Sequence, residues 1–257
     1  MTRRWALIST IAVLTAALVF VGVQLVRGQD SGDGKAQAKP AASPSPSDSA
    51  ESLDGLGWWP LHRSGTAKVG EHDAVFGDGV KWTEGPEGGA LELNGTSGYA
   101  NTNTGLDTAG KDYSAAARVR LTEEGLKGMH TALSQEGERN SAFFLQYSGQ
   151  DQNFAFSFPG ARTVAESSER PRPGRWYHLT GTYSQKDHRM RIYVDGKLAG
   201  TRVASSSVKP TGGVMIGRGK FGGKPADHWN GDIADVHVYD RELTSREVSA
   251  LSSHEPG

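Results

Sequence analysis

Apolar and polar residues alternate with a two-residue period through most of the chain after residue 58. In the segment 113–121 every second residue is apolar and would share one face: Tyr113, Ala115, Ala117, Val119 and Leu121. The same period recurs in segments 154–158, 176–183 and 189–194. Such alternation predicts half-buried β-strands. Because Gly, Asn, Asp and Pro separate these segments, with no amphipathic helix between them, the pattern favours an antiparallel sandwich over a parallel sheet.

Two glycine-containing segments connect predicted strands. The step Asp195-Gly196 lies between alternating apolar residues, and Asp-Gly is a strong signal for a tight hairpin turn because glycine accepts a positive φ. We therefore interpret Asp195 as a corner residue that braces its turn, not as a ligand. The segment Gly217–Lys224 lacks the ending of a phosphate-binding loop, and we expect a mobile rim loop there.

One helix is predicted, close to the C-terminus. Thr244 and Glu247 have the spacing of a capping box, in which each side chain bonds the backbone N–H of the other residue. Leu243 and Val248 occupy the positions of a hydrophobic staple. We expect Val248 and Leu251 to pack this short helix onto the sandwich.

The first 57 residues have a different pattern. Residues 6–26 carry no charge and would span about 30 Å as a helix, which predicts a transmembrane signal anchor after a short cytoplasmic tail, residues 1–5. Arg3 and Arg4 precede the span, so the positive-inside rule places the following residues outside the cell. The alternative is a secreted protein whose leader is cleaved near residues 36–38.

Residues 28–57 are rich in Gly, Ser, Ala and Pro and contain almost no large apolar side chains. Such a segment cannot bury enough surface to offset the cost of ordering its backbone, so it is predicted to be a disordered linker. The folded domain is expected to occupy residues 58–257.

Composition excludes several function classes. Lys and Arg total 28 against 29 acidic residues, so no strong field favours a nucleic-acid partner, and contact with lipid is expected through the N-terminal helix only. The chain has no cysteine, which excludes disulfides, thiolate catalysis and cysteine-based zinc sites. Its eight histidines are scattered without a metal-binding spacing.

Several blocks together resemble the laminin-G-like, concanavalin A-like jelly-roll family. They are "WPL" at 59–61, "GGALELNGTSGYANT" at 88–102, "GRWYHLTGTY" at 174–183, "RIYVDGKLAG" at 191–200, "VMIGRG" at 214–219 and "WNGDIADVHVYDREL" at 229–243. The resemblance covers essentially all residues after the linker. It implies an all-β, two-sheet antiparallel jelly-roll β-sandwich. Such domains bind carbohydrate or protein ligands on secreted and cell-surface proteins.

The chain departs from that family at sites tied to calcium. Members often carry aspartates where this chain has His62 and Ala234. Calcium requires several hard oxygen ligands, so we expect no cofactor and disfavour a structural calcium ion. The remaining unassigned oxygens belong to Asp73, Asn94, Asp232 and Asp235. A third departure is Arg118, at a position where the family often has tryptophan.

A polysaccharide hydrolase or lyase on the same fold is the first alternative. Retaining hydrolysis requires two carboxyl groups about 5 to 5.5 Å apart, as acids at i and i+2 or i+4 on one strand would provide. No predicted strand carries such a pair, since Glu136 to Glu138 falls in a turn-like stretch and Asp232 and Asp235 have odd spacing. We therefore expect no enzyme activity.

Carbohydrate binding needs aromatic faces with polar groups at their edges. The candidate ligand-binding residues are Trp82, Tyr99, Asn103, Arg118, Gln146 and Tyr147. We expect Trp58, Trp176 and Trp229 to be core residues, and Trp59 and Trp82 to be freer. In the strand "FFLQY" one face must point outward, and the sequence leaves open whether Phe144 and Gln146 or Phe143, Leu145 and Tyr147 do so.

These expectations combine into one hypothesis. The chain is predicted to be a membrane-anchored extracytoplasmic module that binds carbohydrate, or a protein, at the cell surface and performs no catalysis. A structural or assembly role beside a partner protein in the cell envelope is the second alternative.

Overall fold

A computed structural model describes residues 55–86, 88–205 and 208–253 of the chain. The predicted tail, transmembrane helix and most of the linker lie outside these residues. Within the described ranges, no helix has the length and apolar character needed to cross a membrane.

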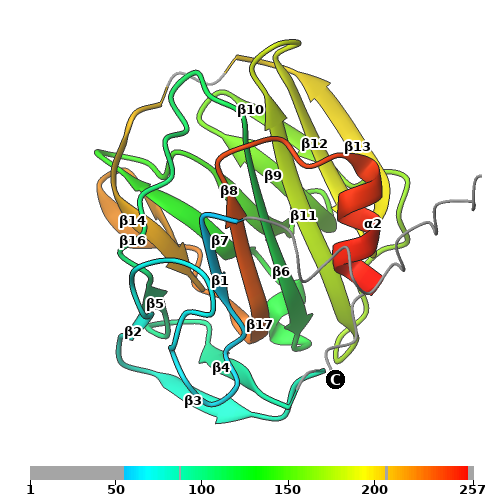
Figure 1. The fold of residues 1–257 in the computed structure, drawn as a ribbon. Helices are drawn as coiled ribbons and strands as arrows, with labels where there is room; N and C mark the ends of the chain where they lie inside the picture. The colour runs from blue at the N-terminus through cyan, green and yellow to red at the C-terminus, as the bar shows by residue number, and fades with distance from the viewer. Residues whose placement is uncertain (1–54, 87, 206–207, 254–257) are drawn as a thin grey trace, which may run out of the picture. The chain divides into compact units, whose positions relative to one another are not determined.

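The described residues form two antiparallel sheets (Figure 1). The eight-stranded sheet contains, in spatial order, β13 (Lys197–Val203), β12 (Arg189–Val194), β11 (Trp176–Ser184), β6 (Tyr113–Leu121), β17 (Asn230–Tyr239), β4 (Ala90–Asn94) and β3 (Val80–Thr83), with β1 (Gly57–Trp59) also paired to β17. The seven-stranded sheet contains β10 (Ala161–Val164), β9 (Asn153–Phe158), β8 (Phe144–Ser148), β7 (Met129–Gly137), β14 (Pro210–Ile216), β5 (Ala100–Asn101) and β2 (Val75–Phe76).

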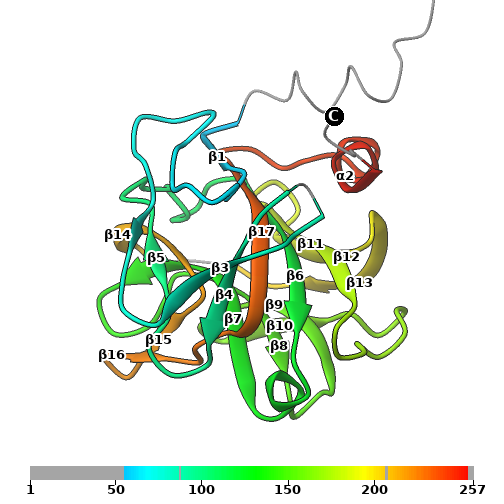
Figure 2. The ribbon, with the colours of Figure 1, turned by 90° about the horizontal axis from the view of Figure 1, so that it is seen from below.

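Three smaller elements complete the fold. A separate hairpin joins β15 (Gly219–Phe221) to β16 (Lys224–Ala226), and a 3₁₀ turn, η1, spans Glu124–Leu126. The helix α2 (Ser245–Ser253) lies outside the eight-stranded sheet, whereas the hairpin lies toward the other sheet (Figure 2). The two-sheet antiparallel sandwich with one short C-terminal helix is the fold class that the sequence predicts.

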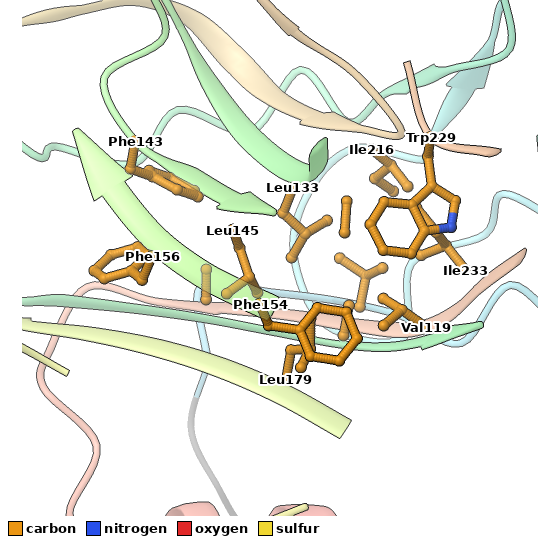
Figure 3. Packing of buried hydrophobic residues seen from close by; sticks show 14 of the residues in the cluster. Val119, Leu133, Phe143, Leu145, Phe154, Phe156, Leu179, Ile216, Trp229 and Ile233 are labelled. Atoms are coloured by element: carbon orange, nitrogen blue, oxygen red, sulfur yellow. The ribbon is translucent and has the colours of Figure 1, made fainter. Parts of the chain in front are cut away.

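The core fills the space between the sheets (Figure 3). Strand alternation supplies it from both sides, because alternate residues of β6 and β11 point inward, as do Phe154, Phe156 and Phe158 of β9. Tyr113 of β6 contacts Phe143, directly before β8, and Phe156 of β9 at ring-centroid distances of 5.6 and 6.0 Å. The predicted inward faces of segments 113–121 and 154–158 are thus confirmed.

The tryptophans differ in part from expectation. Trp229 is fully buried as predicted, but so is Trp59, which was expected to be freer. Trp58 and Trp176 are only partly buried. In β1 successive side chains point to opposite faces, so Trp59 enters the core while Trp58 lies outside and stacks on His237 at 5.3 Å.

The predicted capping box of α2 is confirmed. The Thr244 N–H donates to Glu247 Oε2 at 2.7 Å, and the Glu247 N–H donates to Thr244 Oγ1 at 3.3 Å. Val248 and Leu251 are buried against Ala116, Tyr193 and Tyr239, together with the staple residue Leu243. The helix therefore covers part of the outer face of the eight-stranded sheet.

Both glycine segments form tight hairpins. Asp195 and Gly196 have φ of 49° and 75° and connect β12 to β13, which confirms the corner. The Asp195 carboxylate accepts the His178 N–H of β11 and pairs with Arg175, so it braces the adjacent strand. The segment Gly217–Lys224 is not the expected loop, because Gly222 and Gly223, both with positive φ, close the β15–β16 hairpin.

Candidate functional site

The outer face of the seven-stranded sheet carries a groove. Because Phe143, Leu145 and Tyr147 point into the core, Phe144 and Gln146 of β8 point outward. On β9, Ser157 points outward beside them for the same reason. The question that the sequence left open about the strand "FFLQY" is thus answered in favour of Phe144 and Gln146.

The groove has a volume of about 770 Å³, which is within the usual range for small-ligand sites. Its lining residues come from β7 to β10, the turns between them, β13 and the β15–β16 hairpin: Met129, Asn140, Phe144, Gln146, Gln150, Ser157, Phe158, Pro159, Gly160, Ala161, Arg162, Arg202, Phe221, Ala226 and Asp227. Phe221, near the hairpin tip, exposes 69% of its surface. An aromatic ring therefore lies at the rim of a groove whose lining is more apolar than polar.

Asp227 supplies a carboxylate to this groove. It follows β16 with a φ of 54°, and its backbone oxygen accepts the Thr131 N–H of β7 at 2.7 Å. Among the described residues, no hydrogen bond or salt bridge engages its carboxylate. Burial raises the pKa of Asp227, and the nearby His130, Arg162 and His228 offset this only in part. A half-buried carboxylate with free acceptor oxygens can accept hydrogen bonds from a ligand.

The other polar groups of the groove are largely held in place. Gln146 Nε2 donates to Ser157 Oγ at 2.9 Å, and the Arg162 guanidinium pairs with Asp151 at 2.9 Å. Arg202 Nη1 donates to the backbone oxygen of Arg162 at 3.2 Å. These contacts hold several polar side chains of the groove in place.

The six residues predicted for ligand binding do not form one site. Gln146 lines the groove. Tyr147, its neighbour on β8, points to the opposite side, lies in the core and donates its hydroxyl to the Leu126 oxygen. Trp82 of β3 packs at the edge of the core, where its ring meets Phe76 edge-on at 5.3 Å. Tyr147 is therefore buried in the core, whereas Trp82 is half-buried at its edge.

Arg118 lies on the outer face of the eight-stranded sheet, beneath α2. Its guanidinium donates to the Ser252 oxygen at 3.3 Å and lies 3.5 Å from Asp235. The helix covers this position. Arg118, which replaces the tryptophan often found in the family, therefore does not lie on an open binding surface.

Asp235 joins Arg118 to a buried polar cluster on the same face. His237 Nε2 lies 2.7 Å from Asp235, and Trp58 Nε1 donates to the same carboxylate oxygen at 2.9 Å. Burial acts to raise the pKa of Asp235, but His237, His178 and Arg118 outweigh it and hold the pKa well below its usual range. This cluster fastens β1 to β17.

Tyr99 and Asn103 do lie together, in a second hollow on the seven-stranded sheet. Arg218 is positioned over the Tyr99 ring at 4.7 Å. Asn103, with a φ of 53°, bonds through its backbone N–H to Asn101 Oδ1 at 2.9 Å. The β15–β16 hairpin lies between this hollow and the groove.

The four side chains considered as calcium ligands each have a hydrogen-bond or ion-pair partner inside the protein. Asp73 and Asn94 accept backbone N–H groups, Asp232 pairs with Arg120 at 2.6 Å, and Asp235 with His237. In the part of the chain that the structure describes, no three acidic or histidine side chains gather as a metal ion would require. Glu136, expected in a turn, lies in β7 and pairs with Arg218 and Lys220.

Asp227, Phe221 and Arg202 are among the groove residues that the sequence did not single out. The Gly-Gly step after Phe221 could have predicted a hairpin that lifts this ring. Asp227 and Arg202 offered no local signal, because their place in the groove depends on pairings between distant segments.

Curated relatives match part of the chain. It is 24% identical over 183 residues to the sushi, von Willebrand factor type A, EGF and pentraxin domain-containing protein 1 of Rattus norvegicus, which is 68% of this chain and 5% of that protein. It is 26% identical over 147 residues to the pentraxin-related protein PTX3 of Homo sapiens, which is 54% of this chain and 38% of that protein. The chain thus spans well under half the length of these relatives.

Solved structures share the fold. Domain 4 of AbnA, an extracellular arabinanase from Geobacillus stearothermophilus solved with arabinotriose, has a TM-score of 0.62 and 18% identity, covering 77% of this chain and 98% of that one. The Trypanosoma rangeli sialidase with a covalent intermediate has a TM-score of 0.56 and 19% identity, covering 76% of this chain and 32% of that one. At such identity these structures show the fold alone.

The sequence also matches a family model. The model described as concanavalin A-like lectin/glucanases superfamily, Laminin_G_3, covers residues 94–249. This range begins at the end of β4 and extends into α2, so it includes most of both sheets, the groove and the hairpin. The chain belongs to the concanavalin A-like lectin/glucanases superfamily.

Proposed function

We propose that the chain is a non-catalytic binding module that holds a carbohydrate chain in the groove of its seven-stranded sheet. The observation that carries this proposal is that the free carboxylate of Asp227 and the exposed ring of Phe221 line the same groove. Sugars present hydroxyl donors at their edges and apolar C–H faces, so a carboxylate and an aromatic ring together match them. The arabinanase domain solved with arabinotriose supports this choice of ligand class.

The non-catalytic part of the proposal follows from the acids of the groove. Hydrolysis by the usual mechanisms requires two carboxyl groups flanking the bond that breaks. Asp227 is the single carboxylate among the groove's lining residues, and the nearby Asp151 is neutralised by Arg162.

We also propose that residues 6–26 anchor the module to a membrane, with residues 28–57 as its tether. Carbonate extraction of expressing cells tests the anchor, and release of the chain would contradict it.

The first experiment is calorimetric titration with neutral linear oligosaccharides, beginning with arabinotriose. Asp227→Asn removes the charge but retains a residue that tolerates positive φ. We expect it to weaken binding by about 10- to 100-fold, since hydrogen bonds to charged groups contribute about 1.5–3 kcal/mol. Asp240→Asn, at an exposed position beyond β17, is the matched control. Equal affinity of Asp227→Asn and the parent chain, or no binding by any glycan while a protein is captured, would contradict the proposal.

The same variant has a second readout. Because the folded state raises the pKa of Asp227, folding favours its protonated form, and stability is lost as pH rises through the folded-state pKa. Asn carries no charge, so Asp227→Asn is expected to raise Tm at pH 7.5 and to lose this advantage below the ordinary aspartate pKa. Thermal unfolding at several pH values measures this. Gained stability with lost affinity distinguishes a binding residue from a structural one.

A further inference from the structure

The second hollow lies on the same outer face as the groove but across the β15–β16 hairpin. It has a volume of about 250 Å³ and is lined by Val75, Phe76, Gly77, Tyr99, Asn101, Asn103, Met215 and Arg218. These residues come mainly from β2, β5 and β14, whereas the groove lies over β8 to β10. Strands β8 and β5 are three positions apart in the sheet, which corresponds to about 14 Å. The hollow is therefore a separate site.

Its charge differs from that of the groove. The lining residues include one cation, Arg218, and no carboxylate. Glu136 lies 2.8 Å from Arg218 Nη1 and 3.1 Å from Lys220 Nζ, so one carboxylate is shared by two cations. One positive charge is left over beside the hollow, which favours an anionic ligand.

Unused hydrogen-bond donors surround this charge. Arg218 Nε is buried without a hydrogen-bond partner in the described part of the chain. Asn101 uses its Oδ1 to accept the Asn103 N–H, and no contact among the described residues occupies the side-chain amide N–H groups of Asn101 and Asn103. A guanidinium and two amides are donors that carboxylate and sulfate groups prefer.

The remaining wall is apolar. Met215 points outward because Val214 and Ile216 enter the core, and Val75 of the edge strand β2 exposes 59% of its surface. The Tyr99 ring, held under Arg218, completes this wall. An apolar wall beside a cluster of donors matches a sugar ring that bears an acidic group.

We propose that this second hollow binds an acidic sugar unit, with Arg218, Asn101 and Asn103 contacting its carboxylate or sulfate. The site goes beyond the proposed function, because it contains none of the groove residues and does not depend on Asp227. Neutral and acidic glycans therefore test the groove and the second hollow separately.

The test is calorimetric titration of the full chain, at low salt, with two matched pairs of probes. Tetragalacturonate is compared with its methyl ester, and a heparin tetrasaccharide with its desulfated form, which separates a carboxylate from a sulfate ligand. We expect the acidic member of one pair to bind at least about 10-fold more tightly, and this preference to decline with salt. Asn101→Asp retains the acceptor oxygen that the Asn103 N–H uses but adds a negative charge, so it should abolish the preference.

Gln185→Glu is the matched control, because Gln185 also accepts a hydrogen bond through its amide oxygen but follows β11 and lines neither the groove nor the second hollow. It should retain the preference for the acidic probe. Equal binding of acidic and neutral members in both pairs would overturn the inference, as would a preference lost in Gln185→Glu and retained in Asn101→Asp. If neutral glycans never bind while Asn101→Asp abolishes acidic binding, the second site stands and the proposed groove function fails.

Discussion

At the scale of single residues, His178 is an unusual buried group. It lies on the outer face of β11, and neither of its ring nitrogens has a hydrogen-bond partner among the described residues. The sequence predicts a strand residue whose ring bonds a neighbour, and this prediction is wrong. Thr180 and Thr182 on the same face carry unpaired hydroxyls as well. Burial, reinforced by the Arg118 charge, lowers the pKa of His178 to about 3. The imidazole is therefore neutral at physiological pH.

We predict that His178→Leu stabilises the protein, and more so in acid. At pH 7.5 the gain is expected to be about 1–3 kcal/mol, because an unsatisfied buried polar group is removed. Below pH 6.5, the ordinary pKa of histidine, the unfolded chain binds a proton at His178 that the folded chain does not bind. The free energy of unfolding therefore falls as the pH decreases from 6.5 to the folded-state pKa of about 3. At pH 5 this adds about 2 kcal/mol to the advantage of leucine.

Urea unfolding at both pH values measures this difference. Thr180→Val is the matched control, since it removes an unpaired hydroxyl that does not titrate, and its effect should be the same at both values. An advantage of His178→Leu that does not grow at pH 5 would contradict the assignment of a depressed pKa.

Single residues also show which side-chain positions can be predicted from the sequence alone. The two-residue period in "FFLQY" groups Phe144 with Gln146 correctly, but it contains no information on which group faces the other sheet. Tyr147 was therefore a candidate ligand residue although it packs in the core. Asp227 could not be predicted as a groove residue, because its position depends on the contact between β7 and the segment after β16.

At the scale of elements, α2 is the one whose limits the sequence predicts best. Local chemistry determines it, since its cap, staple and buried face all lie within residues 243–251. For the β15–β16 hairpin the sequence instead predicts a loop, because strands of three residues are too short to show a period. The hairpin lies between the groove and the second hollow on the outer face of the seven-stranded sheet, so without it the sequence could not predict that these are two separate hollows.

We predict that Thr244→Ala lowers the free energy of unfolding by about 1 kcal/mol, the usual cost of losing an N-cap side chain. Burial acts to raise the pKa of Glu247, but the bonds from Thr244 and Arg241 outweigh it and lower that pKa. Since Thr244→Ala weakens these bonds, the variant should also lose less stability on acidification than the parent. Ser249→Ala, at an exposed position within the same helix, should be nearly neutral in chemical unfolding. A larger loss for Ser249→Ala would show that the cap is not the cause.

At the scale of the whole molecule, a glycine of one sheet faces an aromatic ring of the other. Gly181 of β11 points into the core, and a Cβ at this position would lie 2.4 Å from Phe156 Cδ2 of β9. The glycine in "WYHLTGTY" thus sets the distance between the sheets at that point. Sequence patterning identified both strands and their inward faces, but the need for a missing side chain arises only when the sheets are stacked.

We predict that Gly181→Ala destabilises the sandwich by about 1–3 kcal/mol, because one methyl group must displace a ring that is packed on all sides. Phe156→Leu alone should also destabilise, by opening a cavity. In the double variant the leucine leaves room for the methyl group, so the loss should be smaller than the sum of the single losses by about 0.5–3 kcal/mol. Gly105→Ala, where a Cβ would have no neighbour within 4 Å, is the control for the backbone effect of alanine. Additive losses in a urea-unfolding cycle would show that the two sheets are not in direct steric contact at this point.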